Sequence, residues 1–159
     1  MTKKFNVVIV GGGPVGVALA VDLGLRNVSC VLVETRVGLS SIPKGQNLTQ
    51  RTLEHFQFWG LVDELRAARL MPPGHPIGEV TAYRSLMSEY WLAPPGRETV
   101  RSFYSQANER LPQYQMEAVL RKKMAALPNV EARFGWTASN VEQDADGVRV
   151  SVVEENGGG

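Results

Sequence analysis

Residues 5–34 combine a short apolar run, three consecutive glycines, a helix-compatible stretch and a second apolar run that ends in an acidic residue. Residues 5–10 are rich in β-branched side chains, which predicts a strand buried on both faces. Residues 15–25 suit a helix, and residues 29–34 predict a second buried strand. Two buried strands joined by a helix are typical of a parallel sheet. The sequence therefore predicts an α/β fold that starts with a βαβ unit of about 30 residues.

The glycines open a motif whose spacing has a physical use. Residues 11–16, Gly-Gly-Gly-Pro-Val-Gly, match the pattern G-x-G-x-x-G. In this pattern Gly11 allows a tight turn, Gly13 lets the backbone approach a pyrophosphate, and Gly16 lets the helix pack closely on the strand. The helix N-terminus offers amide donors and partial positive charge to the phosphates. Between a strand and a helix, the motif favours a Rossmann-like dinucleotide-binding domain over an ordinary glycine-rich turn.

Glu34 narrows the class of dinucleotide. It ends the second predicted strand, 18 residues beyond Gly16. A carboxylate at this place accepts hydrogen bonds from ribose hydroxyls and repels a 2′-phosphate, so FAD or NAD is favoured over NADP here. Residues 35–46 form an irregular loop with no regular helix pattern, and strand-forming residues precede residue 112. This departure from a regular α/β repeat favours a flavoprotein over a dehydrogenase.

The segments after the loop mix helical and strand-forming patterns. Asn47 is expected to cap a helix that Gly60 ends. Residues 77–104 carry strand-forming side chains, which predicts a β excursion away from the first sheet. The other expected elements are a short helix over residues 61–70, a helix with one buried stripe over residues 112–127, a strand over residues 130–134 and a hairpin over residues 141–153.

The charge balance excludes some partners. With 17 Lys and Arg against 16 Asp and Glu, the chain has a net charge of +1, which favours neither a nucleic acid nor an anionic membrane. The glycines, Pro14 and Asp22 argue against a signal peptide or membrane span over residues 7–25. Cys30 is the only cysteine, and neither histidine has a spaced ligand partner, so we expect no disulfide and no metal site. We expect a cytoplasmic protein.

The combination of motifs resembles the single-component FAD-dependent aromatic hydroxylases, which include para-hydroxybenzoate hydroxylase and the phenol hydroxylases. The stretches that carry the resemblance are residues 8–16, 32–34, 43–54 (Pro-Lys-Gly-Gln-Asn-Leu-Thr-Gln-Arg-Thr-Leu-Glu) and 112–117 (Pro-Gln-Tyr-Gln-Met-Glu). The resemblance implies FAD as cofactor, NADPH or NADH as transient reductant, and O2 and a phenolic or other small aromatic compound as substrates. Such enzymes hydroxylate the ring through a flavin C4a-hydroperoxide.

The resemblance also implies a set of cofactor contacts. Lys44 matches a position near the flavin where relatives usually carry Arg, and Gln46 and Arg51 follow in the same loop and helix start. Gln113 matches a Gln that contacts the ribityl chain, whereas Thr35 stands where many relatives have Arg. The residues expected around the cofactor are Gly11, Gly13, Pro14, Val15, Gly16, Glu34, Thr35, Lys44, Gln46, Arg51 and Gln113.

The resemblance further implies how the chain is divided. Residues 1–75 would begin the FAD-binding domain, residues 76–111 would begin an inserted β-rich substrate domain, and residues 112–159 would return to the FAD-binding domain. Relatives are longer and carry later Asp-Gly and Gly-Asp segments. We therefore expect a truncated N-terminal portion that is inactive alone and retains FAD weakly or not at all. Two other interpretations stay open, an NAD- or FAD-dependent dehydrogenase or reductase and a non-catalytic dinucleotide-binding module.

Overall fold

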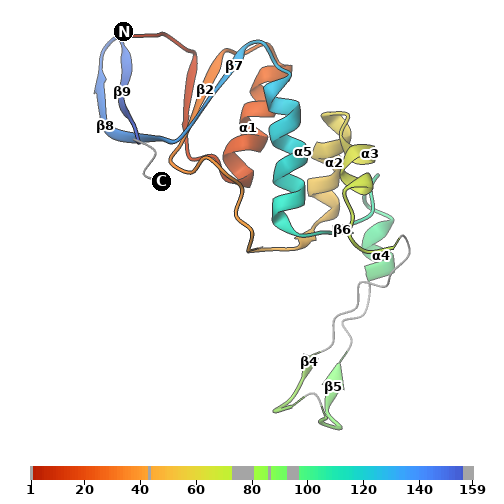
Figure 1. Cartoon of the computed structure of the whole chain (residues 1–159). Coiled ribbons are helices and arrows are strands. Elements are labelled where there is room, and N and C mark those ends of the chain that lie inside the picture. Colours follow the sequence, from red (N-terminus) through yellow and green to blue (C-terminus); the bar gives the residue numbers. More distant parts are fainter. Residues whose placement is uncertain (1, 43, 73–80, 86, 93–96, 156–159) are drawn as a thin grey trace. The chain divides into compact units, whose positions relative to one another are not determined.

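The structure is a computed structural model that describes residues 2–42, 44–72, 81–85, 87–92 and 97–155. Its residues form two compact units (Figure 1). The first unit is Met1–Lys44 together with Gln113–Gly159, and the second is Gly45–Pro112. The three-part division expected from the sequence stays a prediction.

The first unit is built on a parallel sheet of three strands. Its order is β1 (Val7–Val10), β2 (Cys30–Glu34) and β7 (Val130–Phe134). All five residues of β2 are buried, including Cys30 with 0% exposure, because β2 has a strand on each side and apolar side chains on both faces. The parallel pairing of β1 with β2 confirms the predicted βαβ unit and α/β class.

Two helices pack against each other beside this sheet, α1 (Pro14–Leu25) and α5 (Gln113–Ala125) (Figure 1). Val17, Ala20 and Val21 of α1 are fully buried. On α5, the buried residues Met116, Leu120 and Met124 form the stripe that the sequence predicted. Asn129 joins the end of α1 to the start of β7, since its Nδ2 donates to the carbonyl oxygens of Gly24 at 3.1 Å and Val28 at 3.0 Å.

A hairpin completes the first unit. Strands β8 (Trp136–Asp144) and β9 (Gly147–Glu154) pair in antiparallel fashion. In the turn, Oδ1 of Asp144 accepts hydrogen bonds from the amides of Asp146 at 2.9 Å and Gly147 at 3.1 Å. The predicted hairpin is confirmed, and it begins five residues earlier, at Trp136 rather than residue 141.

The second unit contains two short helices, α2 (Gln50–Phe58) and α3 (Val62–Ala67). The prediction that Asn47 caps the first helix is wrong. Asn47 belongs to β3 (Asn47–Leu48), where it pairs with Arg110 of β6 (Glu109–Arg110). Thr49 caps α2 instead, because its Oγ1 accepts a hydrogen bond from the amide of Thr52 at 3.2 Å. Among the described residues, the apolar core of this unit includes Leu53, Phe56, Trp59, Leu61, Leu65 and Leu111.

The expected β excursion over residues 77–104 is found in part. Strands β4 (Thr81–Ala82) and β5 (Trp91–Leu92) form an antiparallel pair. Residues 77–80 and 93–96 of the expected excursion lie outside the described residues. Arg97–Arg101 form helix α4 rather than a strand, since arginine and glutamate favour a helix more than a strand.

Candidate dinucleotide-binding site

The glycine-rich segment forms a sharp turn between β1 and α1. The amide of Gly11 donates to the carbonyl oxygen of Val33 at 2.8 Å, which continues the β1–β2 pairing by one residue. The φ angle of Gly11 is +108°, a conformation that residues with a Cβ atom rarely adopt. Glycine is therefore required for the chain to leave the strand at this point.

The helix starts directly against this turn. A Cβ atom at Gly16 would lie 2.0 Å from the carbonyl oxygen of Gly11. At Gly13, the residue before α1, a Cβ atom would meet nothing within 4 Å. Pro14 is the first residue of α1 and has no amide hydrogen, and Val15 is 80% exposed. The space beside Gly13 is thus open, directly before the first turn of α1, whose leading amides lack intrahelical acceptors, as an anion site requires.

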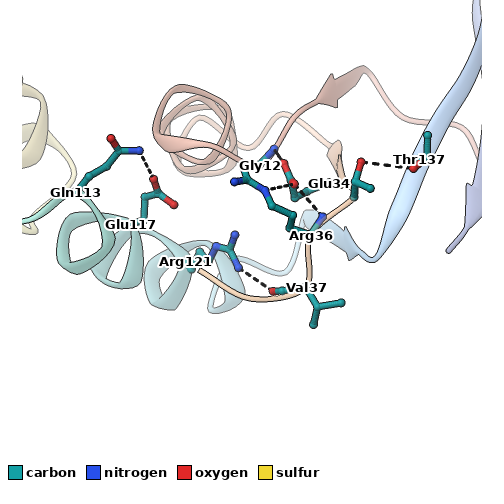
Figure 2. A network of polar contacts seen from close by, with 9 residues as sticks. Gly12, Glu34, Arg36, Val37, Gln113, Glu117, Arg121 and Thr137 are labelled. Carbon is teal, nitrogen blue, oxygen red and sulfur yellow. Dashed lines mark hydrogen bonds and ion pairs between the residues drawn. The ribbon is translucent and has the colours of Figure 1, made fainter. Parts of the chain in front are cut away.

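Glu34 lies at the end of β2 with its carboxylate turned toward the glycine-rich turn (Figure 2). One oxygen, Oε2, accepts a hydrogen bond from the amide of Gly12 at 2.7 Å. The other, Oε1, accepts from the amide of Arg36 at 2.9 Å and from its Nε at 3.1 Å. Glu34 is 8% exposed, so these donors replace most of the water that an exposed carboxylate would bind.

The hydrogen bonds keep Glu34 ionised. Burial raises the pKa of its carboxyl group, but the backbone hydrogen bonds from Arg36 and Gly12, with the Arg36 guanidinium, outweigh burial and hold the pKa below its usual range. At neutral pH the side chain is therefore an acceptor only, as recognition of ribose hydroxyls requires.

A polar row on α5 ends beside the loop that follows Glu34 (Figure 2). Gln113, Glu117 and Arg121 lie on successive turns of α5. Nε2 of Gln113 donates to Oε1 of Glu117 at 2.6 Å, and Glu117 is buried. Arg121 donates from Nη1 to the carbonyl oxygen of Val37 at 3.1 Å. This row positions Gln113 and attaches the loop to α5.

Two further contacts lie near this loop, one made by Arg121 and one made by Thr35. The guanidinium of Arg121 lies 4.2 Å from the ring centroid of Phe134, the last residue of β7. Burial lowers the pKa of Arg121, and the carboxylates of Glu117 and Glu34 oppose that shift. Thr35, at the position where relatives often have Arg, contacts Thr137 of β8 with 3.4 Å between their Oγ1 atoms.

Comparison with known proteins identifies the family. The model of a protein family described as "FAD binding domain" matches residues 4–159. The chain belongs to this FAD-binding domain family. It is 37% identical over 145 residues to a 3-(3-hydroxy-phenyl)propionate/3-hydroxycinnamic acid hydroxylase of Mycobacterium sp. (strain JLS), covering 91% of this chain and 24% of that protein. It is 30% identical over 156 residues to a probable NADH-specific resorcinol 4-hydroxylase of Rhodococcus jostii (strain RHA1), covering 98% of this chain and 28% of that protein.

A solved structure agrees with these relatives. The flavin-dependent monooxygenase PieE, in complex with FAD and substrate, superposes with a TM-score of 0.82 and 28% identity, over 95% of this chain and 27% of PieE. The chain thus spans about a quarter of the length of the proteins it matches. The family predicted from sequence is confirmed.

The residues of this FAD-binding domain fit the adenosine half of FAD. The open space at Gly13 leaves room for a pyrophosphate against the first turn of α1. The ionised Glu34 supplies acceptors for a ribose. No group of three or more His, Cys, Asp or Glu that could hold a metal ion occurs within the residues that the structure describes. In the same part of the chain, none of the helices combines the length and apolar composition that a bilayer crossing needs.

The other expected site residues are divided between the units. Gln113 belongs to the first unit with the glycine-rich turn and Glu34, and Lys44 is an exposed residue at the end of one of its segments. Gln46 and Arg51 belong to the second unit. Arg51 pairs with Glu54 at 3.1 Å and is exposed. The cofactor contacts of all these residues stay predictions.

Sequence reasoning missed four residues of the network. Gly12 occupies a variable place in the motif, yet a Cβ atom there would lie 2.7 Å from Cβ of Glu34. Arg36 could have been found as a cation two residues after the acidic position. Glu117 and Arg121 follow Gln113 at the four-residue spacing of one helix face, which was a detectable signal.

Replacement of Glu34 by glutamine is expected to lower the free energy of unfolding by about 1–2 kcal/mol at pH 7. Because the folded pKa of Glu34 is depressed, its stabilising effect is complete above the unfolded value of about 4.3 and is lost as the pH falls through the folded value. Urea unfolding of the unsubstituted chain and of Glu34→Gln between pH 7 and pH 3 should therefore show that their difference in free energy of unfolding decreases as the pH falls. Glu142→Gln, which removes an exposed carboxylate 3.4 Å from Arg149, is the control. A Glu34→Gln difference that stays constant with pH would contradict the prediction.

Proposed function

We propose that this chain supplies the adenosine and pyrophosphate part of the FAD site in a flavin-dependent aromatic hydroxylase. The observation that carries the proposal is the ionised, buried Glu34 beside an open glycine-rich turn, in a chain 37% identical to an aromatic hydroxylase. The full reaction would use NADPH or NADH and O2. When bound, FAD supplies the redox chemistry that links the nicotinamide, O2 and the aromatic ring.

Each proposed site residue has a role in binding or orienting the cofactor. The backbone of Gly11, Gly13, Val15 and Gly16 holds the pyrophosphate next to the N-terminus of α1, where Pro14 fixes the first helical residue. Glu34 accepts hydrogen bonds from the ribose hydroxyls, and Thr35 lies next to it. Gln113, oriented by Glu117, donates to the ribityl chain. From the family resemblance, Lys44, Gln46 and Arg51 are proposed as further cofactor contacts.

The substrate class follows from the relatives. The names of two of them specify a hydroxyphenyl propionate or hydroxycinnamate and resorcinol, all of which are small phenols. An electron-rich phenolic ring is therefore the substrate class we propose. We also propose that residues 76–111 begin the substrate domain, that the protein is cytoplasmic, and that the chain of 159 residues alone retains FAD weakly.

The test uses this chain within a protein of the relatives' full length. Purified protein should carry FAD, and a small phenol should accelerate NADH or NADPH oxidation at least tenfold. One O2 should be consumed for each hydroxylated product. The phenol analogue without its hydroxyl group is the control substrate. Nicotinamide oxidation that no phenol accelerates would indicate a dehydrogenase or reductase instead. Adenine nucleotide binding without any flavin or oxygen uptake would indicate a non-catalytic module.

A further inference from the structure

The carboxylate of Glu34 is nearly saturated with donors. A carboxylate offers about four lone-pair positions, two on each oxygen. Both positions of Oε1 are used, by the amide of Arg36 at 2.9 Å and its Nε at 3.1 Å. Oε2 accepts from the amide of Gly12 at 2.7 Å, which leaves one position free. A ribose with two neighbouring hydroxyls needs two positions, so one existing donor has to leave.

The three donors differ in how easily they can leave. The amide of Gly12 is fixed in the glycine-rich turn. The amide of Arg36 is fixed because the next residue, Val37, is held through its carbonyl oxygen by Arg121 at 3.1 Å. The side chain of Arg36 is 59% exposed, so its guanidinium exchanges Glu34 for water at little cost. The Arg36 guanidinium is the donor that can leave.

We propose that the side chain of Arg36 occupies an acceptor position of Glu34 when no ligand is bound, and that a ligand carrying a ribose diol displaces it. Arg36 thereby determines how strongly the site discriminates a diol from a single hydroxyl. A ligand with one hydroxyl uses the free position on Oε2 and leaves Arg36 in place. A ligand with two hydroxyls gains a second hydrogen bond but loses the Arg36 contact. This inference rests on the proposed nucleotide site.

The test compares ligands that differ by one hydroxyl group. Dissociation constants of ADP, 2′-deoxy-ADP and 3′-deoxy-ADP are measured by calorimetry for the full chain and for Arg36→Met. Taking ratios between ligands cancels the effect of a lost positive charge on the phosphates, which all three share. We expect removal of one hydroxyl to weaken binding to Arg36→Met by roughly two- to fivefold more than binding to the unsubstituted chain.

Arg149→Met is the matched control, because Arg149 is also an exposed arginine of the first unit in an ion pair with a glutamate. Its ratios should equal those of the unsubstituted chain. A second readout is the Nε–H signal of Arg36 in NMR spectra, which should move to the position of a solvated arginine when ADP is added. The inference would be overturned if removal of one hydroxyl weakened binding to Arg36→Met no more than binding to the unsubstituted chain. It would also be overturned if the Nε–H signal of Arg36 did not move when ADP is added. If none of the three nucleotides binds even when the unsubstituted chain is part of a protein of the relatives' full length, the proposed nucleotide site fails and the inference fails with it.

Discussion

Gly16→Ala is expected to lower the free energy of unfolding of the first unit by about 2–4 kcal/mol. The added Cβ atom would lie 2.0 Å from the carbonyl oxygen of Gly11. That oxygen belongs to the backbone and cannot rotate away as a flexible side chain would, so α1 has to move off the sheet. Urea unfolding followed by circular dichroism measures the loss, and binding of ADP should fall with it.

Gly13→Ala provides the matched comparison within the same motif. A Cβ atom at Gly13 meets nothing within 4 Å, and the φ angle of −72° suits any residue. We expect stability to change by less than about 1 kcal/mol, while ADP affinity falls at least tenfold because the methyl group enters the proposed pyrophosphate position. Equal destabilisation by the two substitutions would contradict the roles assigned to these glycines.

Glu109→Ala is expected to destabilise the second unit by about 2–4 kcal/mol. Glu109 is 7% exposed and forms ion pairs with Arg69 and, at 3.7 Å, with Arg66. Nε of Arg69 is buried without a hydrogen-bond partner, so this guanidinium depends on Glu109 for compensation of its charge. Loss of the carboxylate leaves a partly buried cation without its partner. Hydrogen exchange of the α3 amides measures the effect within this unit.

Two further substitutions give this measurement its controls. Glu89→Ala removes an exposed carboxylate of the same unit and should change stability by less than about 0.5 kcal/mol. Arg69→Met combined with Glu109→Ala removes both charges, and it should recover part of the loss. A Glu109→Ala protein whose α3 amides exchange as slowly as those of the Glu89→Ala protein would refute the assigned role of the ion pairs.

The elements of the first unit were predictable because their signals are local. The β-branched runs before Gly11 and up to Glu34, with a helical stretch between them, specify β1, α1 and β2 without information from distant residues. Asn47 shows the opposite case. Both Asn47 and Thr49 are suitable capping residues, and the choice depends on the pairing of Asn47 with Arg110, more than sixty residues away. The residue pattern of one segment does not contain that information.

The geometry of the glycine-rich turn was predictable for similar reasons, while the cofactor contacts stay predictions. The glycine-rich turn and Glu34 follow from spacing alone. The burial of Glu117 could not be inferred, because a carboxylate is normally excluded from a core unless it has partners. Its hydrogen bond from Gln113 helps to make this burial tolerable. The contact of Arg36 with Glu34 depends on how the loop folds back, which the residue types do not specify.

The buried position of Cys30 allows the opening of the parallel sheet to be measured by labelling of its thiol. Its thiol lies in the central strand with 0% exposure, and burial raises its pKa, so both access and thiolate formation are suppressed in the folded state. Because the sequence has no other cysteine, modification by a thiol reagent records separation of β2 from its neighbours without background. The rate of labelling therefore gives the opening free energy of the sheet that carries Glu34, in the presence or absence of any nucleotide.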